Sequence, residues 1–208
     1  MKKTEYIEGL SYIQQNYTTF FIDLWGVIHN GLQLHSGAIN VLDNLDKINK
    51  RFVLMSNAPR PADSVKKFLS RLKLNPKYFK NIFTSGDASL KSLKENIHGK
   101  TFFHLGPKRD EDLFKQLKKK KKPSFEQCDF ILCTGLFDKK DGFNIKTLEY
   151  YKDYLKPANK LTMVCTNPDL IVNRGKKKEY CAGAIAKVFE DLGGKVIYYG
   201  KPYPGIYD

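Results

Sequence analysis

Polar side chains follow four apolar, strand-like runs of this sequence, and their combination suits phosphoryl transfer. They are Asp23, Ser56-Asn57, the turn Asn167-Pro168-Asp169, and Lys201. Together they supply a carboxylate nucleophile, a hydroxyl and an amide that can donate to an oxyanion, and a cation. Phosphoryl transfer depends mainly on positioning and on the neutralisation of negative charge, which such groups provide. Each residue alone is more typical of an ordinary turn or cap, so the hypothesis depends on their order and spacing.

These positions lie at the ends of predicted strands in a chain that alternates strand and helix patterns. Strands are predicted over residues 20–24, 51–55, 81–84, 101–105, 129–133, 161–165 and 195–199. Helices are predicted over residues 37–50, 61–72, 111–120, 144–155 and 180–192, with a further one beginning near residue 86. This alternation is typical of a parallel sheet with helices on its faces. Because such sheets bind ligands beyond the carboxyl ends of their strands, we expect the candidate residues to meet there.

The composition is that of a globular protein. The 208 residues are 41% hydrophobic and 13% aromatic, which argues against disorder and suffices for one core with a smaller inserted domain. No apolar run approaches the roughly 20 residues that span a bilayer. The N-terminal segment also lacks the apolar stretch of a signal peptide. We therefore expect a cytoplasmic protein that does not bind membranes.

A formal charge of +14 favours anionic ligands. The lysines are spread along the chain, and the one dense run, residues 118–122, closes a predicted helix without the aromatic platform of a nucleic-acid site. Nucleic-acid binding is therefore only a third hypothesis. No C-x-x-C pair or zinc-finger spacing involves the four cysteines, which are Cys128, Cys133, Cys165 and Cys181. Each is expected to be reduced and structural.

From about Thr19 to its last residue, the chain resembles the haloacid dehalogenase-like (HAD) hydrolases. Three segments are similar to the family's first, second and third motifs: Asp23-Leu24-Trp25-Gly26-Val27, Ser56-Asn57, and Tyr199-Gly200-Lys201-Pro202. Thr84-Ser85-Gly86 resembles the segment that leads into a class II cap domain. The turn Asn167-Pro168-Asp169, with the helix that follows at Tyr180, resembles the class IIA branch, which includes NagD-type and 4-nitrophenylphosphatase-like enzymes.

The resemblance implies a fold of class α/β. It consists of a Rossmann-like core, with a parallel sheet between helices, and an α/β cap domain inserted between the second and third motifs. The implied division is a first core segment over residues 1–87, a cap over 88–178, and a second core segment over 179–208. Such a cap closes over the active site and selects the leaving group of the substrate.

The resemblance also implies roles for the candidate residues. Asp23 would attack phosphorus and form an aspartyl-phosphate, Ser56 and Asn57 would hold phosphoryl oxygens, and Lys201 would stabilise charge on both nucleophile and phosphate. Magnesium, a hard cation that prefers oxygen ligands, would bind the Asp23 carboxylate and the backbone carbonyl of Trp25. Two further residues, Asn167 and Asp169, would lie on the substrate and cap side. The implied activity is a magnesium-dependent phosphatase for a small phosphorylated metabolite, such as a sugar phosphate or nucleotide, and a homo-oligomer is compatible with it.

One departure from the family pattern concerns proton transfer. The family's second acid, two residues after the nucleophile, is replaced by Trp25, which has no proton to exchange near neutral pH. His29 is near in sequence, and an imidazole can gain or lose a proton near neutral pH. A plain surface histidine is nevertheless the stronger expectation at that position.

A second departure concerns the family's fourth motif, an acidic pair that completes the magnesium site. Only seven residues follow Lys201, and Asp208 is not expected to substitute for that pair. The sequence therefore predicts a truncated chain, a partner that completes the site, or a loss of catalysis, together with an exposed edge of the core sheet. The alternative function is a catalytically impaired HAD-fold protein that binds phosphate ligands or a partner without turnover.

Overall fold

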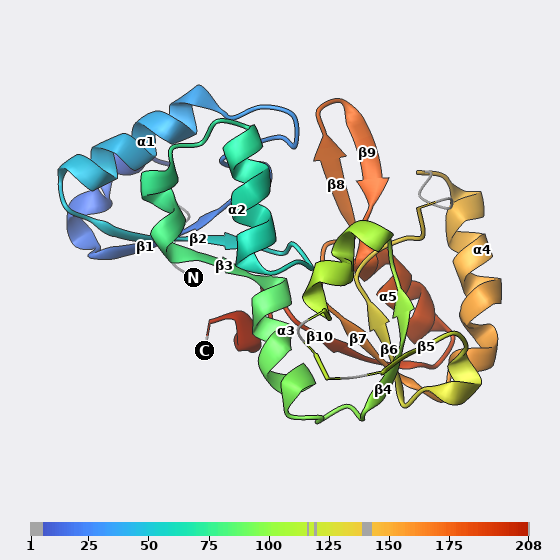
Figure 1. Ribbon diagram of the computed structural model, residues 1–208. Coiled ribbons are helices and arrows are strands. Elements are labelled where there is room, and N and C mark those ends of the chain that lie inside the picture. Colours follow the sequence, from blue (N-terminus) through green and yellow to red (C-terminus); the bar gives the residue numbers. More distant parts are fainter. Residues whose placement is uncertain (1–5, 116, 119, 139–142, 208) are drawn as a thin grey trace, which may run out of the picture.

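The fold consists of two parallel sheets that lie side by side, with a β-hairpin next to them (Figure 1). The computed structural model describes residues 6–115, 117–118, 120–138 and 143–207. Within these residues, one sheet has three strands and the other has five. No helix in this described part is both long and apolar enough to cross a membrane. The α/β class expected from the sequence is confirmed.

The smaller sheet has the strand order β1-β2-β3. Its strands are β1 (Thr19–Asp23), β2 (Arg51–Ser56) and β3 (Ile82–Thr84), and both pairings are parallel. Helix α1 (Ser36–Lys47) connects β1 to β2, and helix α2 (Ala62–Arg71) connects β2 to β3. We refer to these elements as the smaller unit.

The core of the smaller unit lies on one face of its sheet. Leu54 of β2 and Leu24, which follows β1, pack there with Leu42 of α1 and Leu69 of α2, and all four are fully buried. The opposite face is less covered, since Phe21 of β1 is 65% exposed. Strand β1 also lies at the edge of the described sheet. The described part of this sheet therefore ends at β1.

The larger sheet has the strand order β10-β7-β6-β4-β5, and all its pairings are parallel. Its strands are β4 (Thr101–Leu105), β5 (Lys120–Lys122), β6 (Phe130–Cys133), β7 (Thr162–Cys165) and β10 (Lys195–Tyr198). Its helices are α3 (Ser85–Lys94), α4 (Ile145–Leu155) and α5 (Ala182–Asp191). The antiparallel hairpin consists of β8 (Ile171–Arg174) and β9 (Lys177–Tyr180). We refer to these elements as the larger unit.

Short 3-10 helices complete the described chain. They cover Leu10–Tyr12, Gln14–Asn16, Pro76–Asn81, Lys108–Leu113, Phe125–Gln127, Lys156–Ala158 and Pro204–Ile206.

The larger sheet is buried on both faces because successive side chains of a strand point to opposite sides. In β6, Phe130 and Leu132 pack with Leu93 of α3. The intervening residues, Ile131 and Cys133, belong to the core formed with α4 and α5. Helix α3, which begins directly after β3, thus joins the two units by covering one face of the larger sheet (Figure 1).

Helix α5 and strand β10 belong to the larger unit, which differs from the division expected from the sequence. Strand β10 pairs in register with β7, from Lys195 opposite Thr162 to Tyr198 opposite Cys165. Ile185 of α5 is fully buried in the same core. A boundary between residues 178 and 179 would separate β10 from β7, the strand with which it pairs, and α5 from the core that it shares with β7. The expected second core segment therefore begins too early, since most of it packs with the expected cap.

The helix predicted over residues 111–120 is wrong. The structure has the 3-10 helix Lys108–Leu113 there, and then β5, in which Lys120 lies opposite Thr101 of β4. Short, lysine-rich strands are typical of sheet edges, because exposed charges discourage pairing with another chain. Part of the basic run is therefore a sheet edge.

Candidate active site

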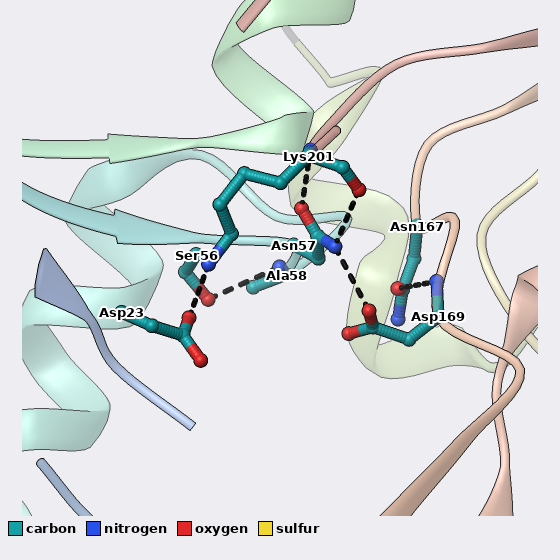
Figure 2. A network of polar contacts seen from close by, with 7 residues as sticks. All are labelled: Asp23, Ser56, Asn57, Ala58, Asn167, Asp169 and Lys201. Carbon is teal, nitrogen blue, oxygen red and sulfur yellow. Dashed lines mark hydrogen bonds and ion pairs between the residues drawn. The ribbon is translucent and has the colours of Figure 1, made fainter. Parts of the chain in front are cut away.

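An ion pair between Asp23 and Lys201 joins the two units (Figure 2). Asp23 is the last residue of β1, and Lys201 follows the end of β10 by three residues. Lys201 Nζ donates a hydrogen bond to Asp23 Oδ1. The side chains of Asp23 and Lys201 are 39% and 23% exposed, respectively, so a ligand can reach both. The two groups that the sequence analysis proposed as catalytic therefore lie in direct contact.

Asn57 ties the segment that carries Lys201 to the end of β2. Its Oδ1 accepts from the Lys201 backbone N–H at 2.7 Å, while its Nδ2 donates to the Lys201 carbonyl at 3.0 Å and to Asp169 Oδ1 at 2.9 Å. Gly200 permits this approach, because a Cβ there would lie 2.8 Å from Asn57 Oδ1. A side-chain amide has two N–H donors, and both are used. We refer to these three hydrogen bonds of Asn57 as the clamp. This arrangement differs from the expectation that the Asn57 amide holds phosphoryl oxygens, since the amide is committed to protein partners.

Ser56, the residue before Asn57, is the last residue of β2 and lines the same cavity as Asp23. Its Oγ accepts a hydrogen bond from the Ala58 backbone N–H at 3.1 Å (Figure 2). This bond orients the hydroxyl and uses it only as an acceptor. The hydroxyl proton therefore remains suited to an oxyanion in the cavity.

The turn after β7 brings Asn167 and Asp169 to the same place. Asn167 Oδ1 accepts from the Asp169 backbone N–H at 3.0 Å. Burial raises the pKa of Asp169, the hydrogen bond from Asn57 lowers it, and the negative charge of Asp23 raises it again. Asp23 and Asp169 are therefore close enough for their charges to interact. The polar residues that follow the four predicted strands thus all line one cavity.

Trp25 lies at the contact between the smaller unit and the hairpin. Its indole Nε1–H donates to the Asn173 carbonyl of β8 at 3.0 Å. Its ring is parallel to that of Phe68 on α2, with centroids 6.5 Å apart, and the Arg174 guanidinium carbon lies 5.2 Å from its centroid. The side chain that replaces the second acid therefore holds hairpin β8–β9 against the smaller unit.

His29 is buried, so the expectation of a surface histidine is wrong. Its exposed fraction is 2%, its ring packs edge-on against Trp25, and its Nδ1 accepts from the Gly31 backbone N–H at 3.0 Å. Burial lowers the pKa of His29 to about 4, against the opposing effect of Asp23. The imidazole is therefore neutral near pH 7 and anchors the turn after β1 instead of exchanging protons with a substrate.

The polar network forms part of the wall of a cavity of about 1060 Å³ between the two units. Four arginines that the sequence analysis did not single out also line it: Arg60, Arg71, Arg109 and Arg174. Arg60 could have been found, because it follows Ser56-Asn57 in the same loop. The positions of Arg109 and Arg174 depend on how the larger unit packs against the smaller one, which local spacing does not encode.

Asp110 is a buried acid that lines the same cavity as the arginines. It is 3% exposed, and its Oδ1 lies 3.6 Å from Arg60 Nε. Burial raises the pKa of Asp110 to about 6, although Arg60 and Arg109 lower it. Asp110 therefore provides a negative charge next to Arg60, and the positive charge of Arg60 favours the ionised form of Asp110.

The residues at Asp23 fit one mode of magnesium binding. No group of three or more His, Cys, Asp or Glu side chains that could hold a metal ion is found among the described residues. Asp208 lies outside those residues. Magnesium is commonly bound through one or two carboxylates, with waters and substrate phosphate as its other ligands. The single Asp23 carboxylate fits this mode and does not form a cage of protein ligands.

Comparisons with known proteins agree with this geometry. A family model described as haloacid dehalogenase-like hydrolase matches residues 20–120. A crystal structure of a haloacid dehalogenase-like hydrolase from Brucella suis is 30% identical, with a TM-score of 0.87, and the match covers 97% of this chain and 73% of that one. This chain belongs to the haloacid dehalogenase-like hydrolase family. A search of curated proteins gives no match.

Two solved phosphatases share the fold of this HAD hydrolase. The 4-nitrophenylphosphatase of Thermotoga maritima is 21% identical with a TM-score of 0.66, over 94% of this chain and 73% of that one. The glycerol phosphate phosphatase of Mycobacterium tuberculosis, solved with magnesium, is 21% identical with a TM-score of 0.65, over 94% of this chain and 58% of that one. The HAD fold that the sequence predicted is therefore confirmed.

Proposed function

We propose that this HAD hydrolase is a phosphatase that transfers the phosphoryl group of a small metabolite to Asp23. The contact of Asp23 with Lys201, beside the Ser56 hydroxyl, is the observation that carries the proposal. The cavity of about 1060 Å³ is large enough for a phosphorylated metabolite. The phosphatases that share the fold support the same reaction class.

Each of these residues has a defined task in the proposed reaction. A carboxylate oxygen of Asp23 attacks phosphorus while the bond from phosphorus to the leaving-group oxygen breaks. Lys201 reduces the repulsion between the carboxylate and the phosphate, and Ser56 donates to a phosphoryl oxygen. Water then attacks the phosphorus of the aspartyl-phosphate, which releases phosphate and restores the Asp23 carboxylate.

The leaving group is expected to depart without a proton from residue 25 or 29. The only N–H of the Trp25 side chain is hydrogen-bonded to the Asn173 carbonyl. His29 is buried and neutral. Substrates whose leaving groups are stable as anions, such as aryl phosphates, should therefore react faster than alkyl phosphates.

Magnesium is part of the proposal. The Asp23 carboxylate would hold it together with the backbone carbonyl of Trp25 and the substrate phosphate. When bound, the ion supplies positive charge that neutralises the phosphate. The magnesium complex of the phosphatase from Mycobacterium tuberculosis, which shares the fold, supports this metal.

The test is a phosphatase assay with 4-nitrophenyl phosphate, with and without magnesium, on the parent and on Asp23→Asn. We expect magnesium-dependent turnover in the parent and a loss of about 10³-fold or more in the variant, since the nucleophile is removed. Asp153→Asn, which changes an exposed acid on α4, is the matched control and should retain the parent rate. Equal rates in the parent and Asp23→Asn would refute the proposal.

The replacement of the second acid by Trp25 favours one alternative, a protein that binds phosphate ligands without turnover. The indole N–H of Trp25 donates to the hairpin, and the ring of Trp25 contacts Arg174 there, so neither can act as an acid. Calorimetric binding of inorganic phosphate to a parent that releases no 4-nitrophenol would support this alternative against the phosphatase.

A further inference from the structure

We propose that Arg60, Arg71, Arg109 and Arg174, here called the arginine cluster, form a second anion site that binds the non-reacting phosphate of a bisphosphorylated substrate. This inference rests on the proposed reaction at Asp23 and names the substrate class. All four side chains line the cavity that contains Asp23. The substrate would place one phosphate at Asp23 and the other at the arginine cluster.

The arginine cluster contains more positive charge than its neighbours neutralise. Arg60 lies near Asp110, and Arg174 Nε donates to the two carboxylate oxygens of Glu179 at 2.9 and 3.2 Å. Within the described part of the chain, neither Arg71 nor Arg109 forms an ion pair. An anion in the cavity would offset this excess of charge.

Arg60 has a hydrogen-bond donor without an acceptor, which a bound anion could supply. Its Nε is buried and has no hydrogen-bond acceptor among the described residues, because 3.6 Å from Asp110 is too long for a hydrogen bond. Burial lowers the pKa of Arg60, Asp110 raises it, and the charges of Arg109, Arg174 and Arg71 lower it further. The guanidinium of Arg60 is therefore repelled by the other three, and a bound anion would relieve that repulsion.

An aromatic pair positions two members of the cluster. The guanidinium carbons of Arg174 and Arg71 lie 5.2 Å and 5.8 Å from the ring centroids of Trp25 and Phe68, respectively. The planes of these two rings are inclined by only 5°. Cation–π contacts of this kind orient a guanidinium while leaving its N–H groups available for an anion. This arrangement gives Trp25 a binding role in place of the acid that it replaces.

Parts of the cluster are close in sequence to the reacting group and line the same cavity. Trp25, which contacts Arg174, is two residues after Asp23, and Arg60 is four residues after Ser56. The planar fork of arginine matches the geometry of phosphate. A metabolite with a phosphate at each end is therefore the ligand class that fits both sites.

The test compares alkanediol bisphosphates of increasing chain length with alkyl monophosphates of the same lengths. Binding is measured by calorimetry in the presence of magnesium, with Asp23→Asn so that the probes are not consumed. At the best length, we expect the bisphosphate to bind about tenfold more tightly than the monophosphate. Arg109→Gln or Arg174→Gln, added to this protein, should remove most of that advantage and change monophosphate binding less than about twofold.

Arg51→Gln is the control, because it removes one exposed arginine at the start of β2, away from the cavity lining. It should leave the affinity for both series unchanged. A second readout is the emission of Trp25, the single tryptophan of the chain. Bisphosphate binding should change this emission, and Arg174→Gln should abolish the change.

Several results would overturn the second site. They are equal affinity for the two series at every length, an equal loss of both in the arginine variants, and an equal gain with ω-carboxyalkyl phosphates, which would indicate a general anion site. The proposed reaction fails in a different way. If the parent hydrolyses neither series but the arginine-dependent preference for bisphosphates persists, the second site stands and the assignment of Asp23 does not.

Discussion

The two units of this HAD hydrolase contribute different parts of the site. The smaller unit presents Asp23 and Ser56 at the ends of adjacent parallel strands, where the reacting phosphate would lie. The larger unit supplies Asp169 and Arg174 from across the cavity, and Lys201 from the segment after β10. The contrast shows that Asp23 and Ser56 are placed by adjacent strands of one unit, whereas the contact of Asp23 with Lys201 and the complete arginine cluster both depend on packing between the units.

The units also differ in how their sheets are covered. The larger sheet is buried on both faces, as Phe102 and Ile131 show with exposed fractions of 1% and 0%. The smaller sheet is well covered on one face only, and Phe21 on the other is 65% exposed. The smaller unit should therefore depend more on contacts between the units, such as the hydrogen bonds of Asn57 to Lys201 and Asp169.

The largest effect should come from removing the cation that links the units. We expect Lys201→Met to lower kcat for 4-nitrophenyl phosphate by about 10²–10³-fold, because the charge that neutralises nucleophile and phosphate is lost. Steady-state kinetics are the measurement. Lys195→Met, an exposed lysine at the start of β10, should keep the parent kcat. A parent-like kcat in Lys201→Met would show that the larger unit takes no part in the chemistry.

The next largest effect should be a pH dependence of folding carried by one buried histidine in each unit. Burial is the main cause that lowers the pKa of His29 and of His104 to about 4, from an ordinary 6.5. As the pH falls from 6.5 to 4, the unfolded chain binds protons that the native protein does not. The free energy of unfolding should therefore fall in this range, by up to about 3 kcal/mol for each histidine.

Asp110 changes the free energy of unfolding in the opposite direction to the two histidines. Its native pKa of about 6 lies above the ordinary 3.8, so the native protein binds the extra proton and gains stability as the pH falls from 6 to 4. Urea titrations across this range are the measurement. His104→Gln should flatten the decline, whereas Asp110→Asn should steepen it. A free energy of unfolding that rises as the parent is acidified from pH 6.5 would contradict both histidine assignments.

A smaller effect, on the free energy of unfolding, is expected when the Asn57 hydrogen bonds that form the clamp between the units are removed. Asn57→Ala removes three hydrogen bonds and leaves the half-buried Asp169 carboxylate without its Asn57 donor. We expect a loss of about 2–3 kcal/mol in the free energy of unfolding, measured in urea. Asn81→Ala removes a single 3.3 Å bond from an exposed site in the smaller unit, and should cost less than about 0.5 kcal/mol. Similar losses in both variants would show that the clamp has no special importance.

The smallest effect concerns the hairpin. Trp25→Phe keeps an aromatic ring but removes the hydrogen bond to the Asn173 carbonyl. We expect a loss of about 1 kcal/mol, with faster amide hydrogen exchange confined to β8 and β9. Unchanged exchange there would mean that other contacts hold the hairpin against the smaller unit.

Local pattern predicted the smaller unit better than the larger one. Strands near Asp23 and Ser56 were predictable because each apolar run ends in a polar residue and is followed by an amphipathic helix. The assignment of β10 to the larger sheet was not predictable, because the sequence of a strand does not by itself determine which strand it pairs with. The environment of His29 and the arginine cluster also escaped prediction, since both depend on side chains from distant segments that meet only in the fold.

The most direct test of the central claim is to look for the phosphoryl group on Asp23. The parent, mixed with 4-nitrophenyl phosphate and magnesium, would be quenched in acid during turnover and digested for mass spectrometry. We predict one phosphoryl group on the peptide that contains Asp23, and none on that peptide from Asp23→Asn. Continued turnover in the parent with no phosphoryl group on this peptide, at a rate that Asp23→Asn matches, would contradict the account.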